Sequence, residues 1–75
     1  MGVFIQRKRK DGKERIVVIP REAILMVELR GERVLVRASG YTEVEAEIKP
    51  EQVEDIKTQL LSFAEGKALR IVEEE

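Results

Sequence analysis

Few side chains in this sequence are suited to covalent or acid-base catalysis. The 75 residues include no histidine and no cysteine, so the commonest catalytic base and the strongest natural nucleophile are absent. Ser39 and Ser62 stand outside any nucleophile motif such as G-x-S-x-G, and no glycine-rich phosphate loop is present. We therefore expect a protein that is not an enzyme and that carries no cofactor.

Three glutamates at alternate positions could attract a cation. Glu43, Glu45 and Glu47 lie on one face of an expected strand. A flat strand holds carboxylates too far apart to form the oxygen cage that a hard cation needs. The sequence therefore predicts a solvated row partly paired with arginines, and no metal site.

A cluster of cations surrounds one expected hairpin turn. Like charges this close repel one another unless an anion is near, and a two-stranded ribbon fits a nucleic-acid groove or can clamp single strands. Three interpretations are open: contact with phosphates, docking on an acidic protein surface that includes a second copy of the chain, and simple solvation of an edge strand. The cluster consists of Arg7, Lys8, Arg9, Lys10, Lys13 and Arg15.

The charge of the whole chain is nearly balanced but unevenly distributed. Residues 1–37 hold ten Lys or Arg and five Asp or Glu, a net charge of +5, whereas residues 38–75 hold four and ten, a net charge of −6. This bipolar layout agrees with the total of −1. We expect a small nucleic-acid-binding, regulator-like protein that uses the basic hairpin. The alternative is a non-catalytic protein-interaction or oligomerisation module.

The elements that position these residues are read from hydrophobic periodicity. They predict an α+β fold in a single domain, residues 1–75: a five- or six-stranded antiparallel meander, or a partly open small barrel, covered by one C-terminal helix. The expected strands are residues 3–9, 14–19, 23–30, a strand starting near 33, 41–48 and 68–72, with the helix at 50–65.

Turn residues set the expected strand registers. Asp11-Gly12 favours a two-residue type I′ turn, which would pair Ile5 with Val18. Gly31-Glu32 favours a two-residue type II′ turn.

That second turn pairs Leu29 with Val34, Val27 with Val36, and Leu25 with Ala38. A three-residue loop, 39–41, then places Val36 against Val44 and Val34 against Ala46, with Arg37 facing Glu43 and Arg33 facing Glu47. Burial and charge pairing select the same register here.

Two regions of the expected sheet carry more apolar side chains than one buried face requires. Residues 16–19, IVVI, are apolar on both faces, which indicates an inner strand or one covered by a partner. In the next two strands, Ile24 and Met26 of the first and Leu35 of the second fall together on a mixed face. They form either an exposed interface patch, which predicts a homodimer, or a group that the curling sheet buries itself.

The helical segment shows one apolar stripe. Pro50 suits its first position and Gly66 can end it in a left-handed conformation. The stripe consists of Val53, Ile56, Leu60, Leu61, Phe63 and Ala64.

Part of the sequence is similar to a known family. The string RIVVIPREAI followed by GERVLV resembles the swapped-hairpin AbrB-type DNA-binding domains over about 25 residues. The intervening LMVELR reads as a strand where that family has a short helical turn, and no site residue is carried over from the resemblance.

The overall composition bears on where the protein works. Charged residues form 39% of the chain, and cysteine, histidine and asparagine are absent, a bias typical of thermophilic proteins and also compatible with a designed scaffold. No stretch approaches the roughly 20 apolar residues of a membrane span. We expect a cytoplasmic protein with no membrane partner.

Overall fold

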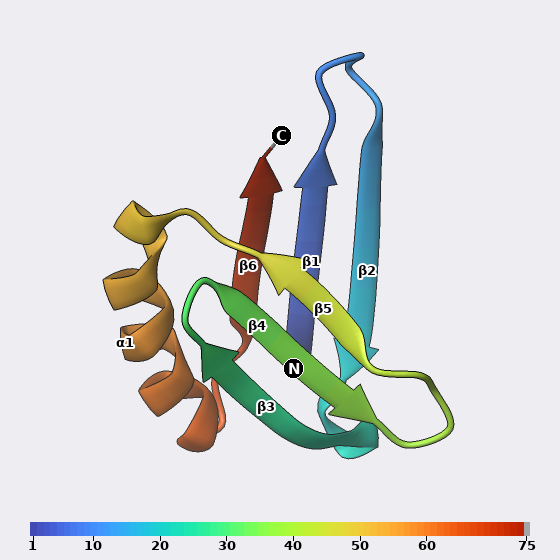
Figure 1. Cartoon of the computed structure of the whole chain (residues 1–75). Helices are drawn as coiled ribbons and strands as arrows, with labels where there is room; N and C mark the ends of the chain where they lie inside the picture. The colour runs from blue at the N-terminus through green and yellow to red at the C-terminus, as the bar shows by residue number, and fades with distance from the viewer. Residues whose placement is uncertain (75) are drawn as a thin grey trace.

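The computed structural model describes residues 1–74 and has an α+β architecture of six strands and one C-terminal α-helix (Figure 1). The strands divide between two three-stranded sheets, in place of the single sheet that the sequence indicates, and the sheets do not close into a barrel. The elements are β1 (Gly2–Lys8), β2 (Glu14–Pro20), the 3-10 turn η1 (Arg21–Ala23), β3 (Ile24–Arg30), β4 (Arg33–Ala38), β5 (Val44–Glu47), the 3-10 turn η2 (Pro50–Gln52), α1 (Val53–Ala64) and β6 (Leu69–Glu74).

The first sheet, sheet A, has the strand order β2-β1-β6, and the second, sheet B, has the order β3-β4-β5. Sheet B is antiparallel throughout. In sheet A, β1 pairs antiparallel with β2 but parallel with β6, so the expected antiparallel meander is wrong for the last strand. The reason is the connection: α1 crosses over between β5 and β6 and delivers β6 in the same direction as β1.

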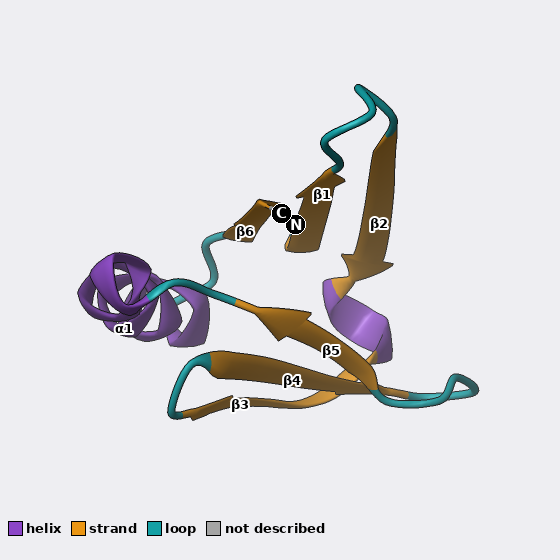
Figure 2. Ribbon diagram, turned by 45° about the horizontal axis from the view of Figure 1, so that its top comes forward, coloured by secondary structure: helices purple, strands orange, loops and turns teal. Residues whose placement is uncertain are grey.

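The hydrophobic core lies between the two sheets and α1, and Figure 2 shows η1 linking the sheets on one side while α1 flanks them on the other. Both sheets and the helix contribute side chains, and the described residues include no buried charged side chain. The core cluster consists of Val3, Ile5, Ile19, Val34, Val36, Ala38, Ala46, Ile48, Ile56, Leu69 and Ile71.

The first hairpin uses a three-residue turn, not the expected two-residue turn. The N–H of Gly12 donates to the C=O of Arg9 at 3.1 Å, and the N–H of Arg9 donates to the C=O of Lys13 at 3.0 Å. Gly12 has φ +85°, and the Asp11 carboxylate accepts the N–H of Lys13 at 2.9 Å. A type I turn followed by a left-handed glycine explains this pattern.

The longer turn shifts the register of the hairpin by one residue. Ile5 pairs with Val17, not with Val18 as expected. Because a shift of one residue exchanges the two faces of a strand, Val17 turns toward the core cluster while Val18 is 66% exposed. β2 is also an edge strand, so the interpretation of an inner strand is wrong.

The registers of sheet B are largely as the turns predict. Leu29 pairs with Val34 and Val27 with Val36, and β5 pairs Val44 with Val36 in the expected register, although it spans only Val44–Glu47. The predicted pairing of Leu25 with Ala38 is wrong.

An irregularity between Ile24 and Met26 causes this difference. It places Ile24 opposite Ala38 and leaves Leu25 as an extra residue that is 67% exposed. A bulge of this kind reverses the facing of the residues before it.

The helix begins with η2 at Pro50 and ends at Ala64. At its end the N–H of Gly66 donates to the C=O of Phe63 and the N–H of Lys67 to that of Ser62, both at 3.0 Å, with Gly66 at φ +102°. This is a Schellman arrangement and confirms the glycine stop.

The apolar stripe of the helix is narrower than expected. Ile56 is 1% exposed, and Val53, Leu60 and Phe63 pack against the core. Leu61 is 71% exposed, because a residue next to the stripe is turned about 100° away from it.

Candidate functional site: the basic hairpin end

The end of the β1–β2 hairpin projects beyond the rest of the molecule (Figures 1 and 2). Five of the six predicted cations are exposed there, and Arg7 alone is half-buried. Within residues 1–74, four of the exposed cations make no ion pair: Lys8, Arg9, Lys13 and Arg15.

Arg7 has a different environment from the rest of the cluster. Its Nε lies 3.0 Å from Oε2 of Glu73 on β6, in a half-buried contact. Glu14, an acidic residue of the same hairpin, is bound to Gln6 and not to Arg7: it accepts a hydrogen bond from Gln6 at 2.6 Å. Arg7 therefore serves the packing of β1 on β6 and is not available as a free cation.

The arginines of sheet B are paired with glutamates along its outer face. Arg33 Nη1 lies 2.7 Å from Glu45 Oε1 and its Nη2 lies 4.0 Å from Glu47, while Arg37 Nη2 lies 3.7 Å from Glu43. The predicted facing of Arg33 with Glu47 is confirmed. These glutamates are consequently compensated within the fold.

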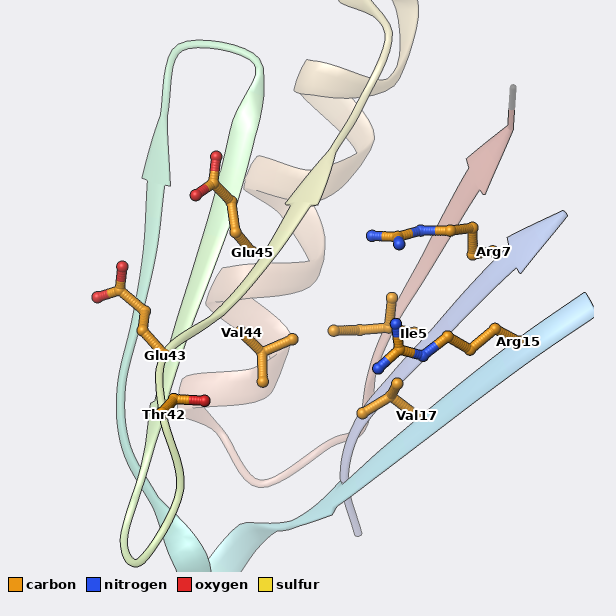
Figure 3. Close-up of a pocket in the computed structure, with 8 residues that line it drawn as sticks. All are labelled: Ile5, Arg7, Arg15, Val17, Thr42, Glu43, Val44 and Glu45. Carbon is orange, nitrogen blue, oxygen red and sulfur yellow. The ribbon is translucent and has the colours of Figure 1, made fainter. Parts of the chain in front are cut away.

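A cleft of about 240 Å³ separates the two sheets below the hairpin end. Figure 3 shows Arg7 and Arg15 reaching from sheet A toward β5, and Val44 pointing back at them. Glu43 and Glu45 line the rim, and their carboxylates turn to the other side of β5. The sheet A wall of the cleft therefore carries Arg7 and Arg15 beside the apolar Ile5 and Val17, and Val44 faces it from β5.

The three predicted interface residues do not form one exposed patch. The bulge turns Ile24 toward the core, where it is half-buried. Leu35 is only 7% exposed, because Glu28 and Glu45 flank it on the neighbouring strands and long charged side chains cover apolar neighbours with their stems. Met26 alone is exposed, at 38%.

Sequence reasoning missed the glutamines that cover β6. Gln59 Oε1 accepts the N–H of Arg70 at 2.8 Å, and its Nε2 donates to the C=O of the same residue at 2.9 Å. Gln52 Nε2 donates to the C=O of Val72 at 2.8 Å. Their spacing of seven residues places both on one helix face, which is the signal that could have found them.

Arg21 is a third structural residue that was not singled out from the sequence. Its guanidinium stacks on the Phe63 ring, 4.1 Å from the centroid, and donates to the backbone C=O groups of Phe63 and Lys67. A cation at a helix C-terminus is favoured by the helix dipole. Arg21 thus fastens η1 to the end of α1.

Exposed aliphatic side chains lie beside the basic end, on the outer face of sheet A. Ile16 is 50% exposed and Val18 is 66% exposed. Both are on β2, and Val18 lies opposite the half-buried Phe4 of β1. Both residues were expected to be apolar strand residues, but their position on the outer face of β2 was not predicted, because the register of the first hairpin was one residue off.

Comparisons of the chain with protein-family models, curated proteins and solved structures found no significant match. Among residues 1–74, no three carboxylates lie close enough together to hold a metal ion. In the same part of the chain, no helix has the length and apolar character needed to cross a membrane.

Proposed function

We propose that the chain binds nucleic acid through the end of the β1–β2 hairpin, with the phosphate backbone as the contacted group. One observation carries the proposal. The arginines of sheet B each have a glutamate partner, whereas Lys8, Arg9, Lys13 and Arg15 have none within residues 1–74. Uncompensated cations on a projecting ribbon are placed for an external polyanion.

The proposed contact is small and sequence-independent. Phosphate contacts position a protein without reading bases. Base stacking has little support, because Tyr41 is the one aromatic ring that is exposed in the described chain, at 72%. Arg7 is left out of the contact set because Glu73 neutralises it.

The experiment is a salt titration of oligonucleotide binding. Each neutralised phosphate contributes a log-log slope of about −0.7 for single strands and about −0.9 for duplex. Replacing Arg9 and Lys13 together with glutamine should weaken binding to all sequences alike and flatten the slope by roughly 1.4 to 1.8.

A charge-matched control separates local contact from net charge. The double variant Lys57→Gln, Lys67→Gln removes the same charge from the helix side and should leave the slope unchanged. Equal effects of the two double variants would show that the hairpin end is not the contact. If the parent protein binds neither single-stranded nor double-stranded DNA or RNA at low salt, the proposal is wrong.

A non-catalytic protein-interaction module is the second candidate. It is favoured by the exposed aliphatic pair Ile16 and Val18 beside the cations, since phosphate contact gives no reason for aliphatic exposure. A protein that fails the oligonucleotide test but is retained on an acidic protein surface in a salt-sensitive way fits this function.

A further inference from the structure

β2 is an edge strand of sheet A. The hydrogen bonds of the β1–β2 hairpin determine which of its backbone N–H and C=O groups point away from β1. The N–H of Arg9 donates to the C=O of Lys13. Because hydrogen-bonded residues alternate along an antiparallel pair, the odd-numbered residues of β2 direct their backbone groups at β1. The N–H groups of Glu14, Ile16 and Val18 are therefore directed away from the sheet.

The other three edges of the two sheets are each obstructed. Gln52 of η2 and Gln59 of α1 hydrogen-bond the outward backbone groups of β6. The irregularity at Leu25 interrupts β3, and β5 has only four residues. β2 is the exception: it is seven residues long, and Pro20 at its end lies opposite Gly2.

From these features we propose that β2 pairs antiparallel with β2 of a second copy of this chain, joining two copies of sheet A into one continuous six-stranded sheet. The proposed two-fold axis passes through Val17. Ile16 of one copy then lies opposite Val18 of the other, and Arg15 lies opposite Ile19. This surface differs from the predicted patch at Ile24, Met26 and Leu35.

The chemistry of β2 selects a second copy as the occupant. Paired about Val17, all the outward N–H groups find carbonyl acceptors, about six hydrogen bonds in total. Glu14 lies opposite Pro20, which has no N–H, so the C=O of Glu14 at each end of the seam is left to solvent. No like charges oppose each other within the strand, and the apolar side chains meet one another.

The two neighbouring registers that leave each side chain on the same face of the joined sheet give less favourable cross-strand pairs. Moving the two-fold axis from Val17 to Val18 places Arg15 of one copy opposite Arg21 of the other, and Glu14 opposite Glu22. Like charges then oppose each other at both kinds of position. A shift toward Ile16 sets the Glu14 carboxylate against Val18. The register centred on Val17 is the one that avoids both.

Lysine substitution at the edge tests the surface. Val18→Lys places a charge on the proposed seam and, because Val18 is 66% exposed, leaves the fold intact. Val72→Lys is the matched control, since Val72 shares the outer face of sheet A but lies on the β6 side. Sedimentation equilibrium without nucleic acid should show a dimer for the parent and for Val72→Lys, and a dissociation constant at least about tenfold higher for Val18→Lys.

A cross-link tests the register and does not depend on how lysine variants fold. The chain has no native cysteine, and across the proposed axis two Val17 Cα atoms would lie about 4.5 Å apart, within reach of a disulfide. Val17→Cys should oxidise to a covalent dimer, and the control Val44→Cys in β5 should not. A parent that stays monomeric at high micromolar concentration overturns the proposal. A dimer that is insensitive to Val18→Lys and not cross-linked by Val17→Cys overturns it as well.

Discussion

The two edge strands of sheet A differ in whether side chains hydrogen-bond their outward backbone groups. At β6, Gln59 and Gln52 supply side-chain donors and an acceptor to the backbone and so take the place of a neighbouring strand. At β2, no side chain within residues 1–74 plays that part, and two exposed aliphatic residues, Ile16 and Val18, lie beside the free edge. An edge covered from within belongs to the fold, whereas an edge left bare is available to a partner.

The largest expected effect comes from loosening the helix that covers β6. Ile56 is 1% exposed and belongs to the core cluster, so Ile56→Ala should lower the free energy of unfolding by about 2–5 kcal/mol. Urea denaturation followed by circular dichroism measures the loss. Leu61→Ala, on the exposed side of the same helix, is the control and should change it by less than about 0.5 kcal/mol.

A smaller effect is expected from removing one of the covering glutamines. Gln59→Ala deletes both hydrogen bonds to Arg70, and it should cost about 1 kcal/mol because the contacts are solvent-exposed. Gln6→Ala, which removes an exposed side-chain bond to Glu14, should cost less. Equal losses in the two variants would mean that the glutamine cover adds no stability beyond that of a surface hydrogen bond.

The smallest effect concerns exchange rates and not stability. In Val18→Lys, at concentrations where sedimentation shows a monomer, the amide of Arg70 should exchange slowly because Gln59 accepts its hydrogen, whereas the amide of Ile16 should exchange quickly. In the parent at high concentration, the Ile16 amide should become protected. Hydrogen exchange read by NMR distinguishes the two amides, and slow exchange of Ile16 in the monomer would contradict the assignment of a bare edge.

Local features of the fold were predictable from the sequence. Apart from the bulge at Leu25, the registers of sheet B follow from turn chemistry and from pairing of apolar with apolar and of Arg33 with Glu47. The helix and its glycine stop follow from periodicity and from Gly66. In each case the residues that decide the structure lie within one hairpin or one helix.

The first hairpin shows why a local signal can still mislead. Asp11-Gly12 suits a two-residue type I′ turn, and the same glycine suits the left-handed position of a three-residue turn. The side-chain bond from Asp11 to the N–H of Lys13 accompanies the longer turn. The choice between them decides whether Val17 or Val18 faces the core.

Contacts between residues far apart in the chain could not be predicted from the sequence. Arg7 counted as one of six hairpin cations, yet its partner Glu73 lies 66 positions away and becomes a neighbour only through the parallel pairing of β1 with β6. The same pairing splits the expected single sheet into two. The proposed nucleic-acid contact therefore involves fewer cations than the composition of the hairpin indicates.

The parallel pairing of β1 with β6 also orders events during synthesis. β1 is the middle strand of sheet A, but one of its two neighbours is made next and the other only after α1 is complete. The β1–β2 hairpin and the three strands of sheet B can form from nearby contacts as the chain emerges. Val3 and Ile5, almost fully buried in the finished fold, must wait for residues 69–74, so we expect nascent chains to be most prone to aggregation just before the last strand leaves the ribosome.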